Sequence, residues 1–329
     1  MIHQKFEMVI GAAGHHIGVM SAETAPAATA QEAHDRAATR GFFFALSAYL
    51  LWGVLPLFLK LTAHIPAMEV VAHRIVWSVP IAGAVLLALG RTADVKAAFR
   101  SPRTLLMAAL TACLITVNWG IYVWAIAADR AIETALGYYI NPLMSVVMGA
   151  VFLSEKLSRV QMVAVGLAAI SVLILTVEAG GLPWISLALA TSFAVYGFLR
   201  KTLPIGPSQG FFLEVLILSV PSLAYIIWLQ ARGEGHFLVS QPDDIGLLLL
   251  CGPATAAPLL LYGFGAKLLK FSTIGVMQYL APTMVFLIAV FVFDEPLGTT
   301  RMIAFILIWA ALALYSWSMF SNRAAASRN

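Results

Sequence analysis

Charged residues and cysteines are scarce in this chain. Only 11% of its 329 residues are charged and 61% are hydrophobic, whereas a soluble domain is about 25% charged and about 45–50% apolar. The two cysteines, Cys113 and Cys251, both fall inside apolar stretches, which excludes a disulfide framework and the paired spacing of a zinc site. This composition excludes an ordinary soluble domain and predicts an all-α, polytopic membrane protein.

In place of charge, the chain has a series of long apolar runs. From Gly41 onward, windows of about 20 mostly apolar residues follow one another with short interruptions, and a helix needs a run of this length to cross a bilayer. Ten such windows are present, at residues 41–60, 68–89, 104–126, 132–153, 160–178, 184–200, 210–229, 244–266, 273–293 and 301–320. We therefore expect ten transmembrane helices.

The two ends of the chain lack this character. Residues 1–40 hold no apolar span, and residues 21–40 form an Ala-rich polar run that predicts a disordered cytoplasmic tail. Residues 321–329 form a second short tail. His15 and His16 could be taken as a metal pair, but two histidines in a flexible tail are more often simply solvated, so we expect no metal site.

Lysine and arginine are divided unevenly between alternate loops. One set of loops holds most of them, and the other has only Lys60, Arg130, Arg232 and Arg301. Because basic residues near span ends are retained on the cytoplasmic side, this bias places both termini in the cytoplasm. An odd number of spans would separate the two tails and destroy the pattern.

One stretch of the chain occurs twice. Residues 118–157 align without a gap on residues 258–297, and each copy reads as two apolar spans joined by a short basic turn. The matched pairs are Tyr122 with Tyr262, Arg130 with Lys270, Tyr139 with Tyr279, Pro142 with Pro282, Met144 with Met284, Glu155 with Glu295 and Leu157 with Leu297. Five spans per half give residues 41–180 and 181–320 opposite orientations, so the duplication predicts two inverted five-helix repeats.

Several motifs make the chain similar to a known transporter family. They are Ala48-Tyr49 with Leu51-Trp52-Gly53, the segment from His73 to Ser78, Asn118-Trp119, the segment from Glu133 to Pro142, the segment from Ser192 to Gly197 with Arg200-Lys201, and Gln278-Tyr279 with Pro282-Thr283. With this combination the chain resembles the RarD group of the EamA family, in the drug/metabolite transporter superfamily, over residues 41–320. The resemblance implies a ten-helix inner-membrane permease, the group's label of chloramphenicol-sensitivity protein, and passage of amino acids and related metabolites. The extended N-terminal tail departs from the group's usual shape.

Polar and aromatic side chains within the spans are candidates for a substrate cavity. A charge at the bilayer centre costs about 2.5–3.5 kcal/mol, so a retained one usually faces protein or water. The cavity candidates are Tyr49, Trp52, His73, Arg74, Trp77, Asn118, Trp119, Tyr122, Tyr139, Asn141, Tyr196, Gln278 and Tyr279. For any single aromatic residue near a span end, an interface anchor is the alternative. Arg74 either extends to the outer headgroups or faces the cavity, where it would contact an anion or pair with Glu133.

Three acids are candidates for proton coupling, namely Glu214, Glu133 and Glu69. Glu214 is flanked by apolar residues, where a carboxyl group can hold a proton, and the alternative is a structural acid bonded to a neighbouring helix. Glu69 and His73 are four residues apart and share one helical face. Pro142 and Pro282 are expected to bend two equivalent helices, because proline removes a backbone hydrogen bond.

Motifs of the common catalytic classes are missing from the sequence. It has no HExxH, GxSxG, P-loop or dinucleotide fingerprint. Glu155 and Glu295 look like paired carboxylates, but they end oppositely directed helices and should lie at opposite membrane faces. We therefore expect no enzymatic activity and no cofactor.

The expected function is movement of a small organic solute by alternating access. The expected partners are that solute and membrane lipid, with no nucleic acid, and a homodimer is compatible with the sequence but not required by it. The competing hypothesis is a scaffold, or a subunit of a membrane complex, that transports nothing.

Overall fold

The computed structural model describes residues 30–153, 157–179, 181–202, 204–238, 242–269, 273–274 and 277–326. The chain forms two compact units, residues 1–37 and residues 38–329. The packing described below belongs to the second unit, and of the first only the start of α1 is described. His15, His16, Glu155 and Lys270 lie outside the described residues.

Every regular element in the described ranges is an α-helix, which confirms the all-α part of the expected fold class. The helices are α1 (Ala30–Leu61), α2 (Ala67–Ala88), α3 (Thr92–Phe99), α4 (Pro102–Ala127), α5 (Ala131–Leu153), α6 (Arg159–Ala179), α7 (Trp184–Thr202), α8 (Pro207–Arg232), α9 (Pro242–Leu268), α11 (Leu280–Phe291) and α12 (Thr299–Ala326).

Eight helices in the described part of the chain are long and apolar enough to cross a membrane. Two shorter apolar helices, Trp184–Arg200 and Leu280–Phe291, occupy the places of the sixth and ninth expected spans. Large apolar side chains such as Leu87, Val177 and Phe291 point outward, as they do where lipid is the solvent. The chain is therefore a multi-pass membrane protein, and the number of ten crossings stays a prediction.

The helix boundaries differ from the predicted spans at three places. α1 begins at Ala30, so residues 30–40 are helical rather than part of a disordered tail, because their Ala, Gln, Glu and Arg residues favour a helix that the apolar span continues. The short α3 was not predicted, since eight residues are too few to cross a bilayer. α11 begins at Leu280, within the window expected to be one span.

Local sequence explains where several helices start and stop. Ser101 caps α4, its hydroxyl accepting a hydrogen bond from the backbone N–H of Thr104 at 3.3 Å, and Pro102 follows as the first helical residue. Gly90 after α2 and Gly233 after α8 have φ angles of +65° and +68°, a left-handed conformation that glycine adopts without steric cost.

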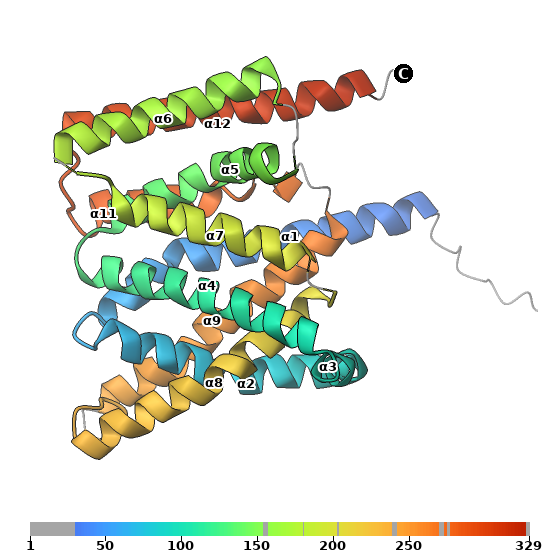
Figure 1. The fold of residues 1–329 in the computed structure, drawn as a ribbon, viewed down its shortest axis with the longest axis vertical. Helices are drawn as coiled ribbons and strands as arrows, with labels where there is room; N and C mark the ends of the chain where they lie inside the picture. Colours follow the sequence, from blue (N-terminus) through green and yellow to red (C-terminus); the bar gives the residue numbers. More distant parts are fainter. Residues whose placement is uncertain are drawn as a thin grey trace, which may run out of the picture. The chain divides into compact units, whose positions relative to one another are not determined.

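The helices pack in a pattern that links the two halves of the chain. α2 packs on α8 and α9, α5 packs on α7 and α11, and α6 lies beside α12 (Figure 1). Close crossings use small residues, because a missing side chain lets two backbones approach. At one crossing a Cβ atom on Gly265 of α9 would lie 2.8 Å from the backbone nitrogen of Ala45 in α1.

Candidate functional site

Arg74, on α2, is the centre of a buried polar cluster. Its side chain is 4% exposed, its Nε donates to Oγ1 of Thr255 on α9 at 2.9 Å, and its guanidinium carbon lies 5.2 Å from the centre of the Trp119 ring on α4. One terminal nitrogen, Nη1, is buried without a hydrogen-bond partner. Arg74 therefore does not extend to the headgroups, which excludes that alternative in this structure.

Of the alternatives for Arg74, the pairing with Glu133 is not formed in the structure. Glu133 accepts two hydrogen bonds from Arg130, one from Nε at 2.7 Å and one from Nη2 at 3.0 Å. Arg130 lies three residues before Glu133, so the pair is made locally around the start of α5 and needs no second helix.

Aromatic side chains from α4 and α5 adjoin this cluster. The rings of Tyr122 and Tyr138 are 5.6 Å apart, and the Tyr138 hydroxyl donates to Oδ1 of Asn118 at 3.1 Å. Asn118 in turn donates to the carbonyl oxygen of Leu189 at 3.1 Å and to Oγ of Ser192 at 3.0 Å, both on α7. Four of the predicted cavity candidates therefore lie close together in the structure, namely Arg74, Trp119, Tyr122 and Asn118.

Tyr139 faces elsewhere. Its hydroxyl pairs with Oγ1 of Thr283 at 2.6 Å, and its ring lies 6.1 Å from that of Phe305 on α12. Its neighbour Tyr138, which was not among the predicted site residues, takes the place beside Asn118. Adjacent helical residues point in directions about 100° apart, so only one of the pair can face α4.

A second aromatic group joins α1 to α9. Tyr49 and Trp52 have ring centres 5.6 Å apart, and both lie within 6.0 Å of the ring of Tyr262. Tyr262, matched to Tyr122 in the internal repeat, was not itself predicted as a site residue. The sequence match between the two tyrosines was the signal that could have identified it.

Glu214, on α8, is held by three side chains from two neighbouring helices, α4 and α7. It is 2% exposed and accepts from Oγ1 of Thr111 on α4 at 2.8 Å and from the hydroxyl of Tyr196 on α7 at 3.2 Å. Nε of Arg200 lies 3.4 Å from its Oε1. The alternative of a structural acid bonded to neighbouring helices therefore describes its contacts, and proton transfer through it stays a prediction.

His73 and Glu69 share a helical face but have different partners. Nδ1 of His73 accepts from Nε1 of Trp77 at 3.0 Å, and its Nε2 is buried without a partner. Glu69 accepts from the backbone N–H of His236 at 2.7 Å, and its second oxygen lies 2.8 Å from Nδ1 of the same residue. Close by, His64 lies 2.8 Å from Oδ1 of Asp244.

Glu295 caps the N-terminus of α5. Its two oxygens accept from the backbone N–H groups of Ala131 at 2.6 Å and Ile132 at 2.9 Å, two donors that the helix itself leaves unpaired. Burial raises the pKa of the Glu295 carboxyl above its usual value, and the two backbone hydrogen bonds oppose part of that rise.

The remaining candidates do not join these clusters. Oδ1 of Asn141 is buried without a partner, while Gln278 and Tyr279 are half-buried just before α11. Pro142 lies inside α5, as predicted for a bend. Pro282 lies in the first turn of α11, which begins at Leu280, and proline at this position does not bend a helix.

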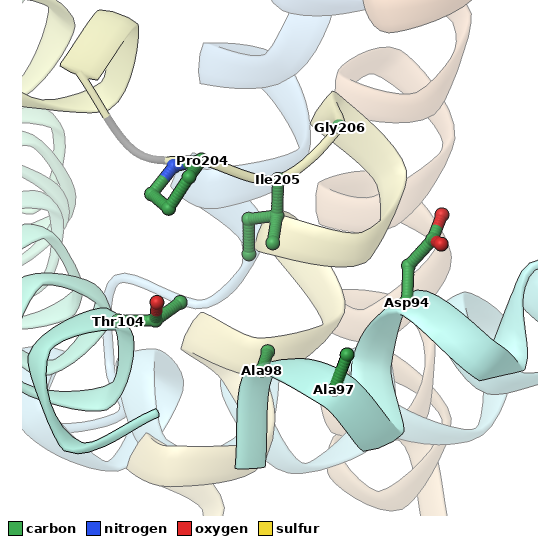
Figure 2. Close-up of a pocket in the computed structure, with 7 residues that line it drawn as sticks. All are labelled: Asp94, Ala97, Ala98, Thr104, Pro204, Ile205 and Gly206. Atoms are coloured by element: carbon green, nitrogen blue, oxygen red, sulfur yellow. The ribbon is translucent and has the colours of Figure 1, made fainter. Parts of the chain in front are cut away.

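A hollow of about 620 Å³ lies at another place, between α3, the start of α4 and residues 204–206 (Figure 2). It is lined by Asp94, Ala97, Ala98, Thr104, Pro204, Ile205 and Gly206. None of these is a predicted site residue, and the hollow is open to the surface. The Arg74 cluster is the stronger candidate, because it holds a buried charge with an unpaired donor.

Known proteins with similar sequences carry transporter names. Residues 39–177 match the EamA-like transporter family. The protein RarD of Streptomyces exfoliatus is 41% identical over 277 residues, which cover 84% of this chain and 88% of that protein. The chain belongs to the EamA-like transporter family. This confirms the resemblance seen in the sequence motifs and places the chain in the drug/metabolite transporter superfamily.

Other EamA relatives extend over the same region. RarD of Escherichia coli strain K12 is 36% identical, covering 84% of this chain and 93% of its own length. The chloramphenicol-sensitive protein RarD of Pseudomonas aeruginosa is 30% identical, covering 86% and 95%. One crystal structure, 19% identical, superposes with a TM-score of 0.54 over 87% of this chain and 98% of that one, so the two share a fold.

In this EamA protein, three important contacts were missed from the sequence. Thr255, Tyr138 and Arg200 each complete a cluster centred on a residue that was predicted. All three contacts join helices that are distant in the chain or depend on which face of a helix points inward. Arg200 alone had a signal, because it is a basic residue close to the end of an apolar span.

Proposed function

We propose that this EamA protein is an inner-membrane secondary transporter, with both termini in the cytoplasm, which moves a small organic solute by alternating access. The solute is an amino acid, a related metabolite or a drug-like compound. In such carriers two oppositely oriented halves rock against each other around a central site.

The observation that supports this proposal is that helices at equivalent positions in the two predicted repeats pack against each other. α2 packs on α8, α5 on α11, and α6 on α12. In each pair the start of one helix meets the end of the other. Glu69, in the first turn of α2, contacts His236 beyond α8, Glu295 beyond α11 contacts the start of α5, and Ser158 before α6 lies 3.2 Å from Ser318 near the end of α12. This antiparallel pairing supports an inverted repeat.

Polar contacts between the proposed halves occur at both ends of α2 and α8. At one end Glu69 contacts His236 and His64 contacts Asp244. Towards the other end Gln209 donates to Asp94 at 2.8 Å. Alternating access requires that the polar contacts at one end break while those at the other end stay intact. The Arg74 cluster would then be open to only one side of the membrane at a time.

A flux assay in proteoliposomes tests the proposal. The purified protein is reconstituted and offered a panel of amino acids, aromatic metabolites and chloramphenicol, with and without a pH gradient. We expect saturable uptake of at least one solute above the level of protein-free liposomes. A scaffold, the competing hypothesis, would give no flux for any compound in the panel.

A further inference from the structure

Arg74 is a buried cation without an anion. The titratable side chains that act on it electrostatically are Cys251, Tyr122 and Tyr138, which are ordinarily neutral at pH 7. In the described part of the chain, no carboxylate lies within ion-pair distance of it. An arginine in the apolar interior of a membrane protein is costly unless a partner compensates its charge.

Other arginines of the chain have the partner that Arg74 lacks. Arg130 lies against Glu133, Arg200 against Glu214 and Arg232 against Glu234. All three of these arginines are more exposed than Arg74, so the unpaired arginine is the one that most needs an anion. A missing partner at this position points to an anion from outside the chain.

The guanidinium group is fixed in a way that leaves part of it available. Nε is held by Thr255, which itself donates to the carbonyl oxygen of Cys251 at 2.8 Å, and one face lies towards the Trp119 ring. Nη1 remains unpaired. An arginine whose plane is set by its neighbours offers a directed donor, which suits the flat geometry of a carboxylate.

We propose that Arg74 binds the carboxylate group of the transported solute, and that Trp119, Tyr122 and Tyr138 contact its aromatic or apolar part. The solute class is therefore an aromatic carboxylate, which includes aromatic amino acids. This inference rests on the proposed transport function. The 4% exposure of Arg74 means that the site is closed in this structure, so the solute enters when the two halves separate.

Ligand-induced thermal stabilisation in detergent tests the site. The probes are 3-phenylpropionate and its uncharged amide, 3-phenylpropionamide, which differ only in the group that Arg74 would recognise. We expect the carboxylate to bind at least about tenfold more tightly than the amide in the wild-type protein. Equal binding of the two probes, or binding of neither, would overturn the proposal.

Two variants separate recognition from folding. Arg74→Gln should lose the preference for the carboxylate while the ligand-free protein unfolds at the same or a higher temperature, because an uncompensated buried charge has been removed. Arg301→Gln makes the same chemical change at a half-buried residue outside the Arg74 cluster, which donates to the carbonyl oxygen of Pro296, and it should keep the preference. If Arg74→Gln unfolds at a lower temperature yet still prefers the carboxylate, Arg74 is structural and the inference is wrong.

The flux assay distinguishes this inference from the proposed function. Saturable flux of neutral solutes but not of 3-phenylpropionate would support transport and contradict the anion site. Carboxylate binding that depends on Arg74, together with absence of flux for any solute, would support the site and contradict transport.

Discussion

Gly252 of α9 lies directly against the backbone of Trp77 in α2. A Cβ atom added to Gly252 would come within 2.5 Å of the Trp77 carbonyl oxygen. Because that oxygen belongs to the backbone, no side-chain rearrangement can remove the clash. The same crossing brings Arg74 of α2 to Thr255 of α9. The missing side chain at Gly252 therefore sets how closely the two helices that hold the Arg74 cluster approach.

Substituting Gly252→Ala should destabilise the protein. We expect a loss of about 1–3 kcal/mol, the usual cost of an inserted methyl group in a packed contact, measured by thermal unfolding in detergent. Gly246→Ala is the matched control, because it lies on the same helix with no atom within 4 Å of its added Cβ. Equal unfolding temperatures for the two variants would mean that the crossing is looser than described.

Thr255→Val should weaken recognition through Arg74. The valine keeps the shape of threonine but removes the oxygen that accepts from Nε, so the guanidinium is no longer held in one plane. We expect KM for carboxylate uptake to rise roughly tenfold with a smaller change in kcat. In the control Thr116→Val, the lost hydroxyl bonds only within its own helix, and an equal KM effect there would contradict a specific role for Thr255.

Glu214 and Arg200 should behave as a coupled pair. Replacing either with Gln removes the opposite charge that faces the other, at an expected cost of about 1–3 kcal/mol, below the about 3–5 kcal/mol of a fully enclosed pair, because the Arg200 side chain is 17% exposed. The double variant should lose less than the sum of the two single variants in thermal unfolding. Strict additivity would show that the two charges do not interact.

Glu214→Gln also tests proton coupling. The hypothesis that this buried acid carries a proton predicts that wild-type flux responds to a pH gradient and that the variant keeps flux but loses the response. The comparison uses the two proteins in matched proteoliposomes at equal protein content. An unchanged pH dependence would reject coupling through Glu214 and favour downhill diffusion.

Glu295 should make stability depend on pH in the range above the usual pKa of a glutamate. In the folded protein the pKa of its carboxyl is raised above the usual 4.5. At a pH between the unfolded-state pKa and the folded-state pKa, the folded protein therefore holds a proton that the unfolded chain has released. The free energy of unfolding then falls as pH rises through this window. Glu295→Gln should flatten this slope in unfolding experiments across the window, whereas the exposed control Glu234→Gln should leave it unchanged. A slope that persists in Glu295→Gln would assign it to another group.

The fold was largely predictable because its main signal is local. An apolar run of sufficient length predicts a membrane helix without any knowledge of neighbours, and the long helices lie at the expected windows. The start of α1 and the short α3 were missed, because alanine-rich and amphipathic segments form helices by propensity and packing rather than by uniform hydrophobicity.

The site was predictable in its residue types but not in its partners. Arg74, Glu214 and Glu133 stood out as charges in or near apolar spans, yet their contacts with Thr255, Arg200 and Arg130 depend on helix rotation and on which helices are neighbours. A single sequence carries little information on either, so Arg74 was assigned the wrong alternative partner and Tyr138 was overlooked.

The central claim, that the halves have opposite orientations, is tested most directly by labelling cysteines from each side of the membrane. Arg91→Cys and Glu234→Cys place exposed thiols just beyond α2 and α8, in a chain whose exposed Cys113 is replaced by alanine while the buried Cys251 is kept. With a membrane-impermeant maleimide, we predict that Glu234→Cys reacts in intact spheroplasts and Arg91→Cys reacts only in inside-out vesicles. Reaction of both thiols from the same side would contradict the inverted repeat and the alternating access built on it.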